Sequence, residues 1–187
     1  MSSSIDNVLV NIDKRIFFLS DGIDETSIGK MCFNILSILK SDDEQEQKQK
    51  NFERKPIEIY VNSFGGSVYD MWALIDIIEN SKTPIYTYCT GYAMSAGFNI
   101  FLAGHKRYAT KHATFLYHQF SGWRSGKYQD LVEDREEMDC IQNTIEQYVI
   151  AKTKFTKKQI EEIRKTKTDV YIHADKAVEL GIIDEVI

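Results

Sequence analysis

A single serine in a run of small residues is the first candidate for chemistry in this sequence. Ser95 lies in TGYAMSAGFNIFLAG, Thr90 to Gly104, after a strand-like run and near the start of a short predicted helix. N–H groups and the positive end of the helix dipole surround a hydroxyl in this position, so it could serve as a nucleophile. Its context, AMSAG, lacks the G-x-S-x-G pattern of the α/β-hydrolases, and the serine could equally be a packing residue.

A second strand-to-helix junction could supply an oxyanion hole. The segment VNSFGGSVYD carries Gly65 and Gly66 between a predicted strand and a predicted helix. Glycines permit a positive φ or the close approach of another chain segment, and exposed N–H groups at such a turn can hold an anion. The sequence therefore offers one hydroxyl and one anion-binding turn on neighbouring parallel strands.

A nucleophilic serine needs a base, and the sequence has four histidines. His118 ends the apolar strand TFLYHQ at the same predicted sheet edge, which makes it the candidate base, although an ordinary core histidine fits there as well. His105 and His112 flank a polar connection, and His173 lies where a helix cap or a surface position is expected. The spacings match no metal-ligand pattern, so no metal site is predicted.

The elements that must position these residues alternate between strands and helices. Strands are predicted at 15–23 (with a turn), 57–63, 84–90, 106–110 and 113–119. Helices are predicted at 25–40, from the glycine pair to about Asn80, and at 93–104, 127–152, 157–165 and 174–181. This alternation indicates an α/β fold of βαβ units with a mostly parallel sheet. The charged, Gln-rich segment 40–55 is expected to be a solvated loop or a frayed helix end.

Composition narrows the class of protein. The chain has 187 residues, 43% of them hydrophobic and 27% charged, which suits one globular domain over 1–187. A net charge of −5 argues against a nucleic-acid partner. No apolar run is long enough to predict a membrane span, and the start has no signal-peptide pattern. Three scattered cysteines suggest reduced thiols and a cytoplasmic location, the host cytoplasm for a phage-encoded copy.

Three blocks of the sequence together resemble the proteolytic subunit of Clp protease. They are YVNSFGGSVYDMWALIDII, CTGYAMSAGFNIFLAGHKRYATKHATFLYHQFSG and TDVYIHADKAVELGIIDEVI, and their order and spacing agree with the family over 16–187. The resemblance implies that Ser95 is the nucleophile, His118 the general base and Asp169 the group that orients His118. It also implies that the backbone N–H groups of Gly66 and Ala96 form the oxyanion hole.

The resemblance further implies a spiral of βαβ units of the Clp protease and crotonase type, with an N-terminal segment (1–15) and a protruding handle helix (127–152). The expected activity is cofactor-free hydrolysis of peptides or unfolded proteins inside homo-oligomeric rings. A separate AAA+ ATPase would supply unfolding, because the chain has no G-x-x-x-x-G-K-[ST] loop. Substrate is expected to bind as an added strand between segments 67–69 and 119–122. The residues implied in substrate binding are Ser67, Val68, Tyr69, Gln119 and Phe120.

The sequence departs from the family pattern at several points. Phe64 and Phe120 stand where the family has prolines, which changes the walls of the cleft. Thr168 replaces an arginine that resembles an inter-ring pairing element, and the 40–55 insert is longer than usual. Three alternatives stay open: a crotonase-like acyl-CoA enzyme, a phage head-maturation type of protease, and an inactive structural ring subunit.

Overall fold

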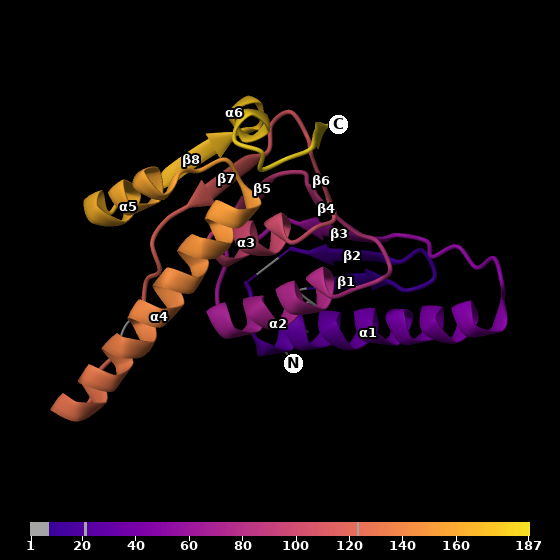
Figure 1. The fold of residues 1–187 in the computed structure, drawn as a ribbon, viewed down its shortest axis with the longest axis horizontal. Helices are drawn as coiled ribbons and strands as arrows, with labels where there is room; N and C mark the ends of the chain where they lie inside the picture. The colour runs from indigo at the N-terminus through magenta and orange to yellow at the C-terminus, as the bar shows by residue number, and fades with distance from the viewer. Residues whose placement is uncertain (1–7, 21, 123) are drawn as a thin grey trace, which may run out of the picture.

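The computed structural model describes residues 8–20, 22–122 and 124–187, which form two β-sheets and the helices packed on them (Figure 1). The six-stranded sheet has the order β1 (Val8–Asn11), β2 (Ile16–Leu19), β3 (Ile57–Val61), β4 (Ile85–Cys89), β6 (Lys106–Ala109) and β9 (Glu185–Val186). The second sheet has the order β5 (Tyr92–Met94), β7 (Thr114–Tyr117) and β8 (Val170–His173). The helices are α1 (Glu25–Lys48), α2 (Val68–Glu79), α3 (Ala96–Leu102), α4 (Tyr128–Lys152), α5 (Lys157–Thr166) and α6 (Ala174–Glu179).

The large sheet is parallel apart from the antiparallel pairing of β1 with β2. In β3 and β4 every second side chain is buried, beginning with Ile57 and Ile85, so each strand presents one apolar row to the helices. Helices α1 and α2 lie side by side along one side of this sheet in Figure 1. The prediction of an α/β fold with a mostly parallel sheet is confirmed.

The second sheet was only partly predicted from the sequence. Strand β7 lies where a strand was expected, but β5 and β8 were not predicted. Both are three or four residues long, and they are strands only because β7 pairs with them on its two sides. Such short segments carry too little periodicity to be recognised without their partners.

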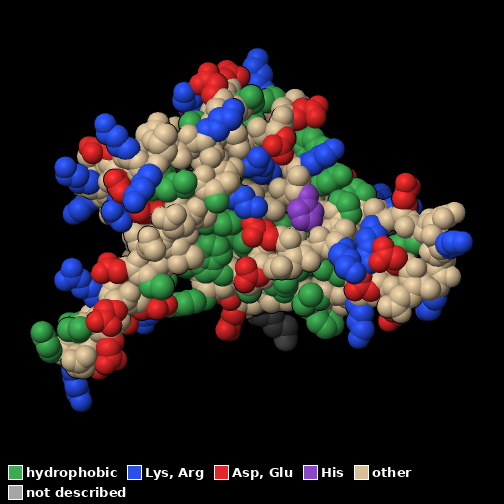
Figure 2. Space-filling model, in the orientation of Figure 1, with side chains coloured by type: hydrophobic (Ala, Val, Ile, Leu, Met, Phe, Trp, Pro, Cys, Tyr) green, Lys and Arg blue, Asp and Glu red, His purple; other side chains and the backbone are tan. Residues whose placement is uncertain are grey.

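Helix α4 projects from the body of the molecule (Figure 1). Its buried side chains, Ile141, Ile145, Glu146 and Val149, all lie in its second half. Hydrophobic side chains lie among the charges at the projecting end (Figure 2), where Tyr128 is 81% and Leu131 is 42% exposed. The long helix predicted at 127–152 is therefore present, and its first half contributes little to the core. Within the described ranges, no helix is both long and apolar enough to cross a membrane.

The charged segment 40–55 differs from its prediction, because α1 continues as an ordered helix to Lys48. Asp42 is buried and accepts hydrogen bonds from two Arg15 nitrogens, at 2.7 and 2.5 Å, and from Thr83 Oγ1 at 2.8 Å. Burial alone would raise the pKa of Asp42, but the bonds from Arg15 and Thr83 leave it below its usual value. The ion pair between Asp42 and Arg15, which is distant in the sequence, stabilises the charged end of α1. The composition of the segment alone could not indicate this ion pair.

We expect the Asp42→Ala substitution to lower the free energy of unfolding by about 2 kcal/mol, because it leaves Arg15 and the buried Thr83 without their shared acceptor. Urea denaturation at neutral pH measures the change. Glu44→Ala is the matched control on the same helix: its pair with Lys48 is exposed, and its loss should change stability by less than about 0.5 kcal/mol. Equal effects of the two substitutions would contradict the structural role of Asp42.

Candidate active site

The three residues predicted to form a triad lie at the ends of the three strands of the second sheet. Ser95 follows β5, His118 follows β7 and Asp169 precedes β8. Parallel pairing aligns Met94 with Leu116, and the Ser95 N–H donates to the Leu116 carbonyl at 3.0 Å. Antiparallel pairing aligns Tyr117 with Val170, so His118 and Asp169 are the next pair in that register. The ladder thus brings residues far apart in the sequence to one edge.

Ser95 occupies a strained turn between β5 and α3. Its φ of 53° and ψ of −123° lie in a region that residues with a side chain rarely adopt. The conformation is held from both sides, because the Ser95 N–H donates to Leu116 and the Ser95 carbonyl accepts from the Asn99 N–H at 3.2 Å. Its hydroxyl makes no capping bond to α3. The turn therefore leaves Ser95 Oγ available to a partner outside the helix.

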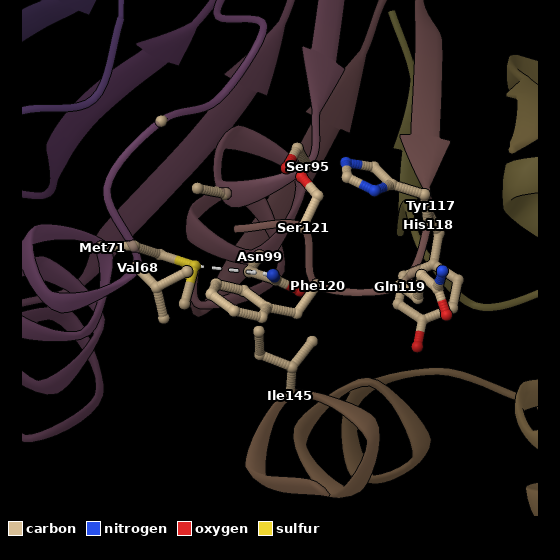
Figure 3. Close-up of a pocket in the computed structure, with 12 residues that line it drawn as sticks. Val68, Met71, Ser95, Asn99, Tyr117, His118, Gln119, Phe120, Ser121 and Ile145 are labelled. Carbon is tan, nitrogen blue, oxygen red and sulfur yellow. Dashed lines mark hydrogen bonds between the residues drawn. The ribbon is translucent and has the colours of Figure 1, made fainter. Parts of the chain in front are cut away.

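His118 and Ser95 line the same cavity, whose volume is about 60 Å³. In Figure 3 the imidazole of His118 points from the end of β7 toward Ser95. Within the described part of the chain, no hydrogen bond joins Ser95, His118 and Asp169, and Asp169 is exposed in the single chain. Catalytic hydrogen bonds are often loose before substrate binds, so this spacing is compatible with an unliganded serine hydrolase site.

The glycine turn before α2 packs directly against Ser95. Gly65 and Gly66 both have positive φ, at 105° and 153°. A Cβ at Gly65 would lie 2.7 Å from Ser95 Cβ and 3.0 Å from the Ala96 nitrogen, so no side chain fits there. Gly66 and Ala96 line the cavity beside Ser95, and neither N–H has an acceptor among the residues described. Two free backbone donors beside a hydroxyl are what an oxyanion hole requires.

The residues predicted to bind substrate line two adjoining cavities. Val68, Gln119 and Phe120 line the cavity beside Ser95. A neighbouring hollow of about 290 Å³ is bounded by Ser67, Tyr69 and side chains of α4. Ser67 is the N-cap of α2 and has an extended backbone, whereas Val68 and Tyr69 form the first turn of the helix. The first N–H groups of a helix have no intrahelical acceptor, so binding of a peptide between 67–69 and 119–122 stays a prediction.

A polar chain that the sequence reasoning missed fixes the segment after His118. The Phe120 N–H donates to Gln142 Oε1 at 2.6 Å, and Gln142 Nε2 donates to Glu146 Oε1 at 2.7 Å. Glu146 is buried and also accepts from Arg164 Nη1 at 3.3 Å. Gln142 and Glu146 are four residues apart on α4, each directly after a buried isoleucine, Ile141 or Ile145. Two polar residues at this spacing next to buried apolar positions were the available sequence signal.

The arrangement of His, Cys, Asp and Glu side chains indicates no metal site in the described part of the chain. Among residues 8–20, 22–122 and 124–187, no group of three or more His, Cys, Asp or Glu side chains is placed to hold a metal ion. His105 and His173, which were set aside as candidate bases, lie elsewhere: His173 is the N-cap of α6, and His105 Nδ1 accepts from the Ile85 N–H at 3.0 Å. The chemistry available at the site is therefore that of a hydroxyl, an imidazole and backbone N–H groups.

Comparison with known proteins assigns this arrangement to a family. A family model described as Clp protease matches residues 2–187. The chain is 32% identical over 176 residues to the ATP-dependent Clp protease proteolytic subunit 1 of Prochlorococcus marinus (strain NATL2A), covering 92% of this chain and 83% of the relative. It is 29% identical over 176 residues to the ATP-dependent Clp protease proteolytic subunit 2 of Parasynechococcus marenigrum (strain WH8102), covering 93% and 83%.

We expect Gly65→Ala to abolish hydrolytic activity, because the new methyl group would collide with Ser95 Cβ and the Ala96 N–H and displace the turn. Peptide hydrolysis by the purified variant measures the loss, and circular dichroism checks that the fold remains. Gly29→Ala is the matched control: nothing lies within 4 Å of its added methyl group, and alanine favours the helix there by roughly 0.5–1 kcal/mol. Full activity of Gly65→Ala would contradict the packing described here.

Proposed function

The chain belongs to the Clp protease family, and from that membership we propose that Ser95, His118 and Asp169 are the catalytic triad of this serine endopeptidase. The observation that carries the proposal is the register of the second sheet. Ser95 directly follows β5, and the register of β7 with β8 extends to His118 and Asp169 as the next pair. No single residue of the three has a distinctive sequence context, and the support comes from their common edge.

In the proposed reaction His118 accepts the proton of Ser95 Oγ as that oxygen attacks the carbonyl carbon of a peptide bond. The oxyanion that forms accepts hydrogen bonds from the N–H groups of Gly66 and Ala96. Each such donor contributes on the order of 3 kcal/mol in comparable sites. His118 then protonates the leaving amine, and in the second half it activates the water that releases the acyl group from Ser95.

Asp169 acts on His118 rather than on substrate in this mechanism. A carboxylate opposite the imidazole accepts its second N–H, fixes the tautomer and stabilises the imidazolium that forms. Cross-strand neighbours have Cβ atoms about 5 Å apart, which is within reach of such a bond after a rotamer change. Because Asp169 is exposed in the single chain, contacts with another subunit are a natural means of ordering it.

The proposed activity takes place in a homo-oligomeric ring, as the family resemblance implies. Exposed apolar side chains on two helices support self-association: Phe33 is 72% and Leu36 is 50% exposed on α1, and Tyr128 is 81% exposed on α4. Apolar groups left in water at such positions favour a protein contact. Both relatives are named as subunits of an ATP-dependent protease, so we propose an ATPase unfoldase as the partner and unfolded polypeptide as substrate. The three free cysteines fit a reducing, cytoplasmic location.

We expect a fluorophosphonate probe to label Ser95 and no other serine, because Ser95 alone is proposed to have both a base and an oxyanion hole. Peptide mapping by mass spectrometry identifies the modified residue.

Asp169→Asn should lower the turnover of a fluorogenic peptide by about 10⁴-fold while the fold is kept, because the wrong histidine tautomer then faces Ser95.

Ser121 supplies the matched control, since it lines the same cavity as Ser95 and His118. Ser121→Ala should keep labelling and activity, whereas Ser95→Ala should lose both. If Ser121→Ala loses the label and Ser95→Ala keeps it, Ser121 is the nucleophile in place of Ser95. An unlabelled wild-type protein would instead favour an inactive ring subunit or the crotonase-like alternative, for which acyl-CoA binding is the direct assay.

We expect the protein to sediment as an oligomer that cleaves short peptides without ATP and spares folded proteins. Thr168 stands where the family has an inter-ring arginine, and its hydroxyl is 2.8 Å from that of Thr166 in the same chain, so single rings should coexist with double rings. Sedimentation velocity over a concentration series, with peptidase assays on the same samples, tests this. A fully active monomer would contradict the chamber, and unaided degradation of a folded protein would contradict the gating.

A further inference from the structure

Charged side chains line the hollow of about 290 Å³ that adjoins the cavity beside Ser95. The two spaces share Gly66, Val68, Phe120 and Ser121 as walls. Gly66 is also the residue whose N–H is proposed to hold the oxyanion. A substrate side chain that enters the hollow therefore belongs to a residue close to the cleaved bond.

Helix α4 and the start of α2 place one carboxylate on the wall of this hollow. Asp134, Glu137, Met138 and Ile141 lie at helical spacing on one face of α4, and all four line the hollow. From the facing wall, the Tyr69 hydroxyl donates to Glu137 Oε1 at 2.9 Å. This bond between two helices holds the Glu137 carboxylate at the lining, although the side chain is exposed to solvent.

Glu137 is the carboxylate of the hollow that has no counter-charge. Arg124 lies 3.7 Å from Asp134, measured from Nε to Oδ1, so these two side chains form a pair. Within the described part of the chain, Glu137 Oε2 takes part in no ion pair or hydrogen bond. The hydrogen bond to Glu137 raises the pKa of Tyr69, so the hydroxyl keeps its proton and stays uncharged. The hollow therefore carries a net negative charge.

The surroundings decide which side chain fits the hollow. Residues 128–139 of α4 include six Asp or Glu and one Arg, a field that attracts a cation and repels a carboxylate. Val68, Phe120, Met138 and Ile141 supply apolar wall, against which methylene groups can pack. Lysine and arginine side chains combine a methylene chain with a cationic end, and so they match both features.

We propose that Glu137 is a specificity-determining residue that selects a lysine or arginine side chain of the substrate within two residues of the cleaved bond. The inference rests on the proposed role of Ser95 as nucleophile, since that role places the substrate along these walls. The methylenes of the basic side chain contact Phe120 and Met138, and its cationic group donates to Glu137 Oε2. A norleucine side chain of similar length contacts the same walls but leaves that oxygen to water.

Internally quenched peptides that carry lysine, norleucine or glutamate at one residue within two of the cleaved bond test the proposal, with mass spectrometry of the products to locate that bond. At one position, wild-type kcat/KM should be about fivefold higher for lysine than for norleucine, the scale of one partly exposed ion pair. Glutamate at that position should give the lowest value. Raising the ionic strength to about 1 M, where the Debye length is about 3 Å, should reduce the lysine preference.

A pair of neighbouring variants distinguishes Glu137 from the general charge of α4. Glu137→Gln removes the charge but keeps an acceptor for Tyr69, so lysine and norleucine peptides should be cleaved at nearly equal rates. Glu136→Gln is the matched control: it removes the same charge one residue away, from an exposed side chain that does not line the hollow, and the lysine preference should stay. A preference that survives in Glu137→Gln would contradict the proposal.

The fluorophosphonate label separates failure of this inference from failure of the triad. A wild-type protein that is labelled at Ser95 but prefers lysine over norleucine at none of the tested positions overturns the role of Glu137 and leaves the triad in place. This result needs no variant, so it does not depend on how the substituted proteins fold. A protein without label at Ser95 overturns both proposals.

Discussion

The active-site edge depends on the pairing of β7 with its two neighbours. Strand β7 is four residues long, yet it aligns Ser95 through β5 on one side and Asp169 through β8 on the other. Side chains alternate between the two faces of a strand, so a slip of one residue would turn His118 away from Ser95. The buried residues Phe115 and Tyr117 anchor this register against Phe98, Phe101 and Phe155 in the core. Hydrophobic packing thus fixes the placement of polar groups.

The second constraint is the close contact between two turns. Gly65 lies against Ser95, and Gly66 lies against the backbone of Ile23, with Ser67 N–H donating to the Ile23 carbonyl at 2.7 Å. These contacts exclude side chains from the glycine turn and support the strained φ of Ser95. The Gly65 N–H donates to Ser63 Oγ, whereas the Gly66 N–H has no acceptor among the residues described, and Gly66 lines the cavity. The strained serine, the close packing of the two turns and the free donor of Gly66 are therefore consequences of one arrangement.

Helix α4 links this site to the periphery of the molecule. Its second half carries its buried side chains. Gln142 accepts from the Phe120 N–H in the segment after His118, and Glu146 accepts from Gln142 and from Arg164 on α5. Helix α5 leads through residues 167 and 168 to Asp169. The first half of α4 projects from the body with apolar groups exposed. A subunit contact at that end would act on a helix that is hydrogen-bonded to Phe120, a residue lining the cavity beside Ser95.

The sequence by itself determined the βαβ alternation and the long helix, because these depend on local periodicity. The candidate triad and oxyanion residues came from the resemblance of three sequence blocks to the Clp protease family. Only the tertiary structure decided that α1 runs to Lys48 and that β5 and β8 exist. The roles of the buried Asp42 and the half-buried Gln142 belong to the same group. Each depends on partners distant in the chain, because a polar residue in a helix looks the same in the sequence whether it faces water, an arginine or a backbone N–H group.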